Sequence, residues 1–247
     1  MGHTDVDETG RRADASVTPA LVGGVRQARK QRTRQTLLDA ALRLLEQQSL
    51  SSLGLREVTR EAGIAPAAFY RHFTDLAQLG VALVEESFGS LHAMVREIRG
   101  RGGDADEVIG RSVDVIAAHV HQHRAHFRFL ARERHGGVAA VRAAIAAELD
   151  GFVRDLVEDL SQQPESAGWS TADLRVLAEL YVNQTMLTAA ALLDAGMDVD
   201  ASRADAGSGA LGMGAAVYSA AEERILETAR MQLRLISLGR RYWLDQR

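Results

Sequence analysis

The sequence predicts an all-helical protein, and three observations lead to this prediction. Only three prolines, the residues that most often break helices, occur in 247 residues. The long stretches between them are rich in Ala, Leu, Val, Arg and Glu, a composition that favours helices over sheets. From residue 76 onward, no stretch alternates apolar and polar residues as a half-buried strand does. A chain of this length can form one or two helical domains and bury a sizeable core.

The composition is that of a soluble globular protein, with 46% hydrophobic and 25% charged residues. The chain has no cysteine, which excludes a disulfide framework and a thiolate metal site and indicates a reducing compartment, the cytoplasm. Its best continuous apolar run, residues 186–193, is much shorter than the roughly 20 residues that cross a bilayer. Residues 1–25 are polar and acidic and lack the apolar segment of a signal peptide. We expect them to form a disordered leader, and we expect no membrane partner.

Charge is distributed unevenly along the chain. Residues 1–25 contain two basic and four acidic side chains, residues 26–73 nine and four, and residues 74–247 eighteen and twenty-five. The net charges of the three segments are therefore −2, +5 and −7, and the whole chain carries −4. A compact basic segment beside an acidic body is typical of a protein in which one small domain binds a polyanion.

The basic segment begins with an amphipathic helix over residues 26–48. Its apolar side chains recur at spacings of three and four and form one stripe: Leu37, Leu38, Ala41, Leu42 and Leu45. Its first third carries five cations, at the end where the helix dipole favours anions: Arg26, Arg29, Lys30, Arg32 and Arg34. Such a run of charge is either a solvated face or a contact with nucleic-acid phosphates.

Two short helices follow, over residues 55–62 and 66–72. We expect Ser51 and Ser52 to cap the first of them and Gly63 to end it. The second begins with a proline, which suits this position because its missing N–H would have no helical partner in any case. Two short helices joined by a glycine turn and braced by a longer helix form a helix-turn-helix, whose second helix enters the DNA major groove. A helical hairpin without a nucleic-acid role is the alternative, and the adjacent basic helix argues against it.

The segment LREVTREAGIAPAAFYRHFTD resembles the DNA-binding signature of the TetR family of bacterial transcriptional repressors. The resemblance implies a DNA-binding domain over residues 26–75 and a ligand-binding and dimerisation domain over residues 76–247. It also implies that Tyr70 and His72 contact phosphates. Many members of the family have a phosphate-binding lysine at the start of the fourth helix, where this chain has Asp75.

The candidate DNA contacts come from three places in the basic segment. The second short helix opens with small residues, which let the backbone approach base edges and can meet a thymine methyl group: Ala65, Pro66, Ala67 and Ala68. Further phosphate or base candidates flank them: Arg56, Thr59 and Arg71. We expect cations of the first helix to replace the missing lysine: Arg29, Lys30 and Arg32. Phe69 and Phe73 are expected in the core.

We expect the acidic body to form a helix bundle. The predicted helices cover about residues 76–99, 106–134 with a break near His123, 138–162, 171–195 and 215–243. The breaks between them fall at residues 100–104, 135–137, 163–170 and 196–214. Bundles of this kind often enclose a ligand between their helices.

Two segments of the body, residues 127–160 and 229–247, resemble the FabR/DesT branch of the TetR family. That branch represses genes of fatty-acid biosynthesis and desaturation and responds to acyl-CoA or acyl-carrier-protein thioesters. The resemblance implies a tunnel for an acyl chain, lined by candidates that are equally compatible with a packed core: Phe88, Leu91, His92, Phe127, Leu130, Tyr181, Gln184 and Met186. Three arginines are candidates for the headgroup or for pairs within their own helix: Arg128, Arg132 and Arg134.

The last helix carries more apolar side chains than a peripheral helix needs: Leu226, Met231, Leu233, Leu235, Ile236, Leu238, Tyr242 and Trp243. We expect a partner to cover them. In the family, the last two helices of two subunits form a four-helix bundle, which implies a homodimer. Its two recognition helices would lie one DNA turn apart, roughly 34 Å, on a pseudo-palindromic double-stranded operator.

The other motifs do not indicate catalysis or a cofactor. His119, His121, His123 and His126 lack the carboxylate partner at fixed spacing that is typical of a metal site. The glycines of GSGALG, residues 207–212, match a dinucleotide-binding pattern by spacing but follow no predicted strand. A nucleophile elbow and a Walker lysine are missing from the sequence. We therefore expect no catalytic residues, no metal and no cofactor.

Together these features predict a homodimeric repressor that controls fatty-acid biosynthesis or desaturation genes and responds to a long-chain acyl thioester. Two alternatives remain open. One is a TetR-type regulator of efflux or catabolism genes that senses another hydrophobic molecule, and the ligand that co-purifies would separate it from the first. The other is a helical enzyme that retains a DNA-binding domain, which turnover of an acyl-CoA would reveal.

Overall fold

The computed structural model describes residues 19–100, 103–206 and 218–243, and all regular structure within these ranges is helical. The helices are α1 (Pro19–Leu45), α2 (Leu55–Glu61), α3 (Pro66–Phe69), α4 (Leu76–Gly100), α5 (Ala105–Gln122), α6 (Arg124–Glu133), α7 (Ala139–Ser161), α8 (Thr171–Ala206) and α9 (Ala220–Tyr242). Two short 3-10 helices join them, η1 (Leu50–Ser52) and η2 (Pro164–Ser166). The predicted all-helical fold is confirmed.

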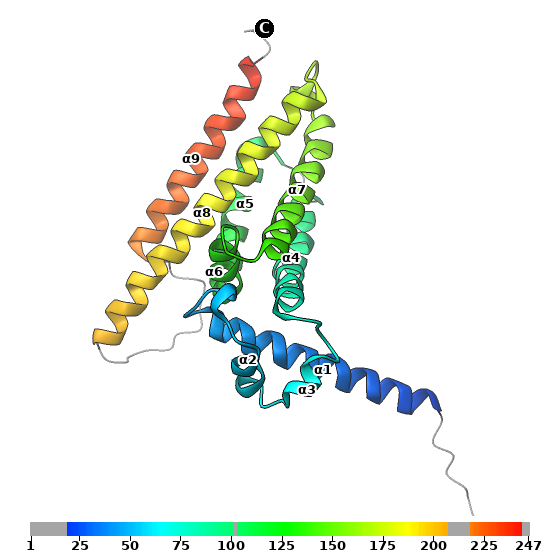
Figure 1. Ribbon diagram of the computed structural model, residues 1–247. Coiled ribbons are helices and arrows are strands. Elements are labelled where there is room, and N and C mark those ends of the chain that lie inside the picture. Colours follow the sequence, from blue (N-terminus) through cyan, green and yellow to red (C-terminus); the bar gives the residue numbers. More distant parts are fainter. Residues whose placement is uncertain (1–18, 101–102, 207–217, 244–247) are drawn as a thin grey trace, which may run out of the picture.

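The helices form two parts, which we call the head (α1 to α3 with η1) and the body (α4 to α9). Figure 1 shows the long helices of the body running side by side, with the head at their lower end. α1 crosses beneath the body, and α2 and α3 lie below α1. Within the body, α8 packs on both α7 and α9, and α4 packs on α7. The arrangement leaves α2 and α3 at the end of the molecule, free to face a large partner.

One hydrophobic core runs through both parts. Buried residues of the head, such as Leu37, Val58 and Phe69, belong to the same cluster as Leu83 of α4 and Phe129 of α6. The head is therefore not tethered by a loop alone, because apolar burial holds it against the body. A second cluster joins α5, α6, α8 and α9, and a third lies between α7 and α8.

η1 sits at the junction of head and body. A Cβ atom on Gly80 of α4 would lie 2.4 Å from Cδ2 of Leu50 and 2.7 Å from Cγ2 of Val141 on α7. Because no side-chain carbon fits between these groups, glycine at position 80 lets η1, α4 and α7 meet. This close approach explains a glycine in the middle of a helix, where the residue is otherwise unfavourable.

Several predicted helix ends are confirmed. Gly63 adopts φ +65°, the left-handed conformation that suits glycine, and follows the end of α2. Pro66 occupies the first turn of α3. His123 has non-helical angles, φ −124° and ψ 37°, and separates α5 from α6 where the break was predicted.

Two predictions about the head were wrong in detail. α3 ends at Phe69 and not at residue 72, because the N–H groups of Arg71 and His72 donate three residues back, in a tighter turn. Ser51 and Ser52 lie in η1 and do not cap α2. The cap is Gly54, whose N–H donates to the Glu57 carboxylate at 2.9 Å.

The start of α1 and the end of α8 also differ from the predicted boundaries. α1 begins at Pro19, so the end of the predicted leader (1–25) is helical, and residues 1–18 lie outside the described part of the chain. α8 continues through Gly196 to Ala206, although a break was predicted there. A Cβ on Gly196 would lie 1.6 Å from Nη2 of Arg124, so this glycine allows an arginine to pass and does not end the helix. The GSGALG segment lies outside the described residues.

α8 contains a long apolar stretch that no continuous apolar run in the sequence predicts. Its stretch Thr171–Gly196 is long and apolar enough to cross a membrane by length and composition, with a mean hydropathy of 1.3 over its most apolar 18-residue window. Scattered polar residues interrupt every run within it, which is why the sequence showed no candidate. One such helix is weak evidence for a membrane, because core helices of soluble proteins pass the same test.

The contact at Gly80 predicts a difference between two glycines of α4. Gly80→Ala should lower the free energy of unfolding by about 1–3 kcal/mol, because the methyl group overlaps Leu50 and Val141. Gly89→Ala in the same helix meets nothing within 4 Å and should raise the stability by up to about 1 kcal/mol. Urea unfolding at one fixed protein concentration measures both. Equal stability of the two variants would contradict this description of the junction.

Candidate nucleic-acid interface

The exposed face of the head is built from α3 and the turn after it. Ala65, Pro66 and Ala67 are exposed at the start of α3, as are Tyr70 and Arg71 beyond its end. Ala68 and His72 are half-buried. Because these side chains are small and α3 lies at the end of the molecule, its backbone can closely approach base edges in a DNA groove.

The inner face of α3 anchors it to the head. Phe69 and Phe73 are buried, as predicted, with ring centroids 5.6 Å apart. Arg56 is exposed on α2. Thr59 is buried, and its Oγ1 donates to the Leu55 carbonyl at 3.1 Å, so its assignment as a DNA contact was wrong. On a helix as short as α2 the spacing of residues does not settle which polar group faces inward.

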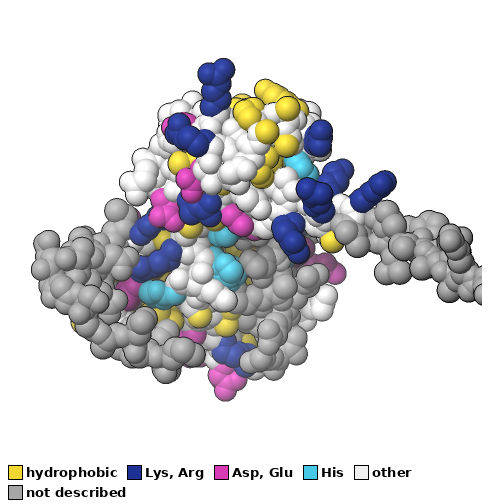
Figure 2. Space-filling view, turned by 90° about the horizontal axis from the view of Figure 1, so that it is seen from below, with side chains coloured by type: hydrophobic (Ala, Val, Ile, Leu, Met, Phe, Trp, Pro, Cys, Tyr) yellow, Lys and Arg dark blue, Asp and Glu magenta, His cyan; other side chains and the backbone are white. Residues whose placement is uncertain are grey.

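Cations of α1 lie beside α3. Arg29, Lys30 and Arg32 are exposed, as a phosphate contact requires. The Arg34 guanidinium lies over the Phe73 ring, 5.3 Å from its centroid, a contact that the sequence analysis did not single out. Figure 2 shows Lys and Arg side chains spread over this end of the molecule, with a group at the right of the view.

These cations also act on His72. Burial first, and then the positive charges of Lys30, Arg34 and Arg71, lower the pKa of His72. The imidazole is therefore neutral near pH 7 in the free protein. The same interaction places two residues of α1 electrostatically close to the turn after α3, which makes α1 and α3 parts of one basic surface.

Asp75 stands where the family resemblance led us to expect a lysine, and it has a structural role. Its Oδ1 accepts a hydrogen bond from the Gln78 N–H at 2.7 Å. Gln78 Oε1 in turn accepts from the Thr74 N–H at 2.6 Å. The two side chains cap the N-terminus of α4, where an acidic group is favourable.

Arg132 of α6 forms hydrogen bonds with backbone carbonyl groups at the end of α1. Its Nη1 donates to the carbonyls of Leu45 at 2.6 Å and Gln48 at 2.7 Å, and its Nη2 donates to that of Glu46 at 3.4 Å. These are carbonyl groups that the end of a helix leaves without a partner, and a cation is favourable there. The guanidinium of Arg132, for which a role at a ligand headgroup was predicted, is thus engaged with the end of α1 in this structure.

The next residue of α6 holds η1. Glu133 is 1% exposed, and its Oε1 accepts a hydrogen bond from the Leu50 N–H at 2.8 Å. A buried carboxylate without such a donor would be costly. We call Arg132 and Glu133, with the backbone groups that they bind, the α6 clamp. It fixes the position of the head from one end of α6.

The predicted tunnel residues fall into separate places. Three of them lie in the core shared by α4, α6 and α7: Phe88, Leu91 and Leu130. His92 extends this group, because its ring stacks on Phe152 at 4.1 Å and its Nε2 lies 2.9 Å from Glu148 Oε2. Phe127 and Tyr181 belong instead to the cluster against α9. Met186 is half-buried on α8.

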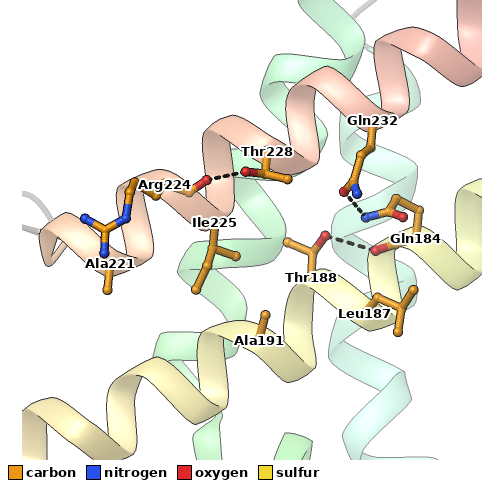
Figure 3. A pocket seen from close by; sticks show the side chains of 9 residues that line it. All are labelled: Gln184, Leu187, Thr188, Ala191, Ala221, Arg224, Ile225, Thr228 and Gln232. Atoms are coloured by element: carbon orange, nitrogen blue, oxygen red, sulfur yellow. Dashed lines mark hydrogen bonds between the residues drawn. The ribbon is translucent and has the colours of Figure 1, made fainter.

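Gln184 lies on the outer side of the body. A groove of about 450 Å³ runs between α8 and α9, and Figure 3 shows Gln184 and Gln232 facing each other across it. Their amides are hydrogen-bonded at 2.6 Å. Leu187 and Ile225 also line this groove. Gln184 is thus separated from Phe88 and Leu91, and the structure does not bring these predicted residues together.

A second groove of about 370 Å³ lies between α7 and α8. Its lining mixes apolar side chains such as Ile145 and Leu149 with charged side chains of both signs. Arg134, His135 and Arg142 are among the lining residues, together with Asp150 and Glu179. Of the three arginines considered for a headgroup, Arg134 is the one that lines this groove.

An apolar face covers the outer side of α8 and α9. Its exposed members are Val176, Leu180, Leu187, Met231, Leu235, Leu238, Tyr242 and Trp243. Leu235 is the most accessible, at 68%. Leu226 and Leu233, which were predicted to need a partner, are buried against α5 and α8. We call the exposed set the α8–α9 face.

Histidines meet where α5 ends. The rings of His119 and His123 lie 4.4 Å apart, and those of His123 and His126 lie 5.9 Å apart. Burial, and then the charges of His123 and His126, lower the pKa of His119 to about 4. In the part of the chain that the structure describes, no three His, Asp or Glu side chains are placed to hold a metal ion.

Two family models match most of the described chain. Residues 37–83 match "Bacterial regulatory proteins, tetR family", which covers the helix-turn-helix and the start of α4. Residues 105–206 match "Tetracyclin repressor-like, C-terminal domain", from α5 to the end of α8. The first segment covers the packed part of the head and the start of α4, and the second covers the body without α4 and α9.

Solved structures share this fold. The fatty acid degradation regulator FadR from Bacillus halodurans is 14% identical, with a TM-score of 0.60 over 83% of this chain and 94% of that chain. FadR from Bacillus subtilis, solved in complex with stearoyl-CoA, is 14% identical, with a TM-score of 0.60 over 82% and 96%. A TetR-family transcriptional regulator from Streptomyces coelicolor is 21% identical, with a TM-score of 0.57 over 83% and 96%. Identities this low show a common fold alone.

The α6 clamp predicts unequal effects of two neighbouring arginines. Arg132→Ala should lower the free energy of unfolding by about 1–2 kcal/mol, because charge-assisted hydrogen bonds to the end of α1 are lost. Arg134→Ala, which removes the same charge from the α7–α8 groove, should change it by less than about 0.5 kcal/mol. Thermal unfolding followed by circular dichroism compares them. Indistinguishable transitions would show that the clamp does not stabilise the fold.

Proposed function

The chain belongs to the TetR family of bacterial regulatory proteins, and from this premise we propose that it is a homodimeric repressor. It acts in the cytoplasm, and a hydrophobic effector makes it release or bind its operator. The observation that carries the proposal is the presence of two exposed surfaces on one molecule. One is the exposed face of α3 with cations beside it, and the other is the apolar α8–α9 face.

The head is suited to duplex DNA. The exposed residues at the start of α3 are Ala65, Pro66 and Ala67, which have no long side chain to keep the backbone from base edges. Tyr70 and Arg71, exposed beyond them, can donate to phosphates. With so few polar groups on α3, we expect much of the affinity to come from phosphates and therefore to depend strongly on salt.

A second copy of the chain is the partner that we assign to the α8–α9 face. The exposed side chains recur along α9 at Met231, Leu235, Leu238 and Tyr242, the spacing of one helical stripe. Contiguous apolar patches on soluble proteins mark interaction sites. Two-fold pairing through this face places two heads on the same side, as a pseudo-palindromic operator requires.

For the effector we propose a long-chain acyl thioester. Three features support this: the resemblance of the body to the FabR/DesT branch, the aromatic core around Phe88, His92 and Phe152, and the cations of the α7–α8 groove, Arg134 and Arg142. The FadR structure with stearoyl-CoA shows that a protein of this fold can hold such a ligand. Control of fatty-acid biosynthesis or desaturation genes follows from this ligand class.

The acyl chain would have to displace packed side chains. Phe88 and Phe152 are buried with ring centroids 5.9 Å apart, and neither groove described above is lined by them. Entry of a ligand between α4, α6 and α7 therefore repacks the core that these helices share with the head. A ligand that binds one arrangement of head and body more tightly than the other changes the affinity for DNA. The change is at most the ratio of the ligand's affinities for the two arrangements.

The proposal is tested at the dimer interface. Leu235→Glu buries a carboxylate in the proposed interface and should give a monomer at micromolar concentration. Loss of the second half-site should weaken binding to a duplex selected by the wild-type protein by about 100-fold or more. Analytical ultracentrifugation measures the assembly, and fluorescence anisotropy measures the affinity.

Ala147→Glu on the exposed side of α7 is the matched control, and it should remain dimeric with wild-type affinity. A wild-type protein that selects no duplex at low salt would end the regulator hypothesis. A dimeric Leu235→Glu variant with unchanged affinity would end the assignment of the interface.

A further inference from the structure

α1 is longer than the head requires. Its packed part begins at Leu37, the first residue of α1 in the hydrophobic core. Before that point the helix extends back to Pro19, and the side chains of residues 26–32 are exposed. Helices in proteins owe most of their stability to a packed face. A projecting helix end that is rich in cations is therefore a candidate for contact with something outside the chain.

Three of its cations share one face. Arg26, Lys30 and Arg34 are each four residues apart, so they lie along one side of the helix. Arg34 rests on the Phe73 ring, and the charges of Lys30 and Arg34 reach His72. This face of α1 therefore continues the surface formed by α3 and its following turn. We call these three residues the α1 stripe.

The remaining cations of this segment point elsewhere. At about 100° per residue, Arg32 lies some 160° from the stripe, on the opposite side of α1. Among the described residues, no ion pair joins Arg26 or Lys30 to a carboxylate. Arg34 also acts electrostatically on Glu86 of α4, so it serves both the body and the stripe. The stripe is thus a row of cations without counter-charges at its outer end.

The direction of α1 decides where the stripe reaches. In Figure 1, the N-terminal end of α1 leaves the head on the side opposite to α8 and α9. Pairing through the α8–α9 face would place the two-fold axis on the other side, so α1 points away from the centre of the operator. From Arg26 to Arg34 the helix rises about 12 Å, the length of about three to four base pairs of duplex.

We propose that the α1 stripe binds the sugar-phosphate backbone of DNA that flanks the half-site read by α3. The inference rests on the proposed function and extends it. Phosphates would supply the counter-charges that Arg26 and Lys30 lack among the described residues. Contacts with the sugar-phosphate backbone do not depend on base sequence. The flanking DNA must therefore be long enough to reach the stripe, but its sequence can be arbitrary.

Two duplexes test the proposal. Both carry the operator core that the wild-type protein selects from a random pool, and the longer one adds about six base pairs of arbitrary sequence on each side. Fluorescence anisotropy over a series of KCl concentrations gives the affinity and its salt slope for each. We expect the wild-type protein to bind the longer duplex at least about tenfold more tightly, with the salt slope steeper by up to about four for two stripes that each gain two phosphates.

The variant Arg26→Ala/Lys30→Ala should lose this advantage and bind both duplexes with equal affinity and equal salt slope. Its control, Arg154→Ala/Arg234→Ala, loses the same charge from exposed ion pairs on α7 and α9 of the body, and should keep the preference for the longer duplex. Alanine favours helices, so neither variant should disturb α1, and circular dichroism checks this.

The outcomes separate the two levels of the hypothesis. If the core duplex binds but added flanks gain nothing, or if the stripe variant keeps the gain, the proposal for the stripe is wrong while DNA binding stands. If the control loses the gain as well, the effect is one of overall charge and the stripe is again rejected. If no duplex binds at all, both the stripe and the proposed function fall.

Discussion

The structure depends on the contact between α6 and the end of α1. Arg132 donates to carbonyl groups that the end of α1 leaves without partners, and Glu133 accepts from Leu50 in η1. Around these hydrogen bonds, the apolar residues of the head and of α4, α6 and α7 form one cluster. Because α1 braces α2 and α3, the position of the DNA-facing surface is set by the body and not by a flexible connection.

This constraint gives the body a physical means to act on the head. Close packing means that side chains of α4, α6 and α7 cannot be displaced independently of the neighbours that they share with α1 and η1. An effector that separates these helices changes the hydrogen bonds of the α6 clamp or the packing of Leu50 against Gly80. By thermodynamic linkage, DNA that binds one arrangement more tightly would change the affinity for the effector by the same factor by which the effector changes the affinity for DNA.

Local signals predicted the parts of this fold that depend on neighbours in sequence. Gly63 ends α2 because of its left-handed backbone, Pro66 begins α3, and the break at His123 separates two helices. The clamp could not be predicted in this way, since Arg132 binds carbonyls 84 and 87 residues earlier in the chain. Gly196 was misinterpreted for the same reason, because the arginine that needs its space comes from another helix. Long-range contacts of this kind leave no periodic trace in the sequence.

The most direct test of the central claim measures how an effector changes DNA affinity through the clamp. Fluorescence anisotropy with the selected duplex, in the presence and absence of stearoyl-CoA, compares the wild-type protein with Arg132→Ala. We expect the thioester to change the wild-type affinity by about fivefold or more. We expect Arg132→Ala to bind the thioester but to show little of this change. An equal response of both proteins would contradict the role of the clamp, and a wild-type affinity that stearoyl-CoA leaves unchanged would contradict the assignment of the effector.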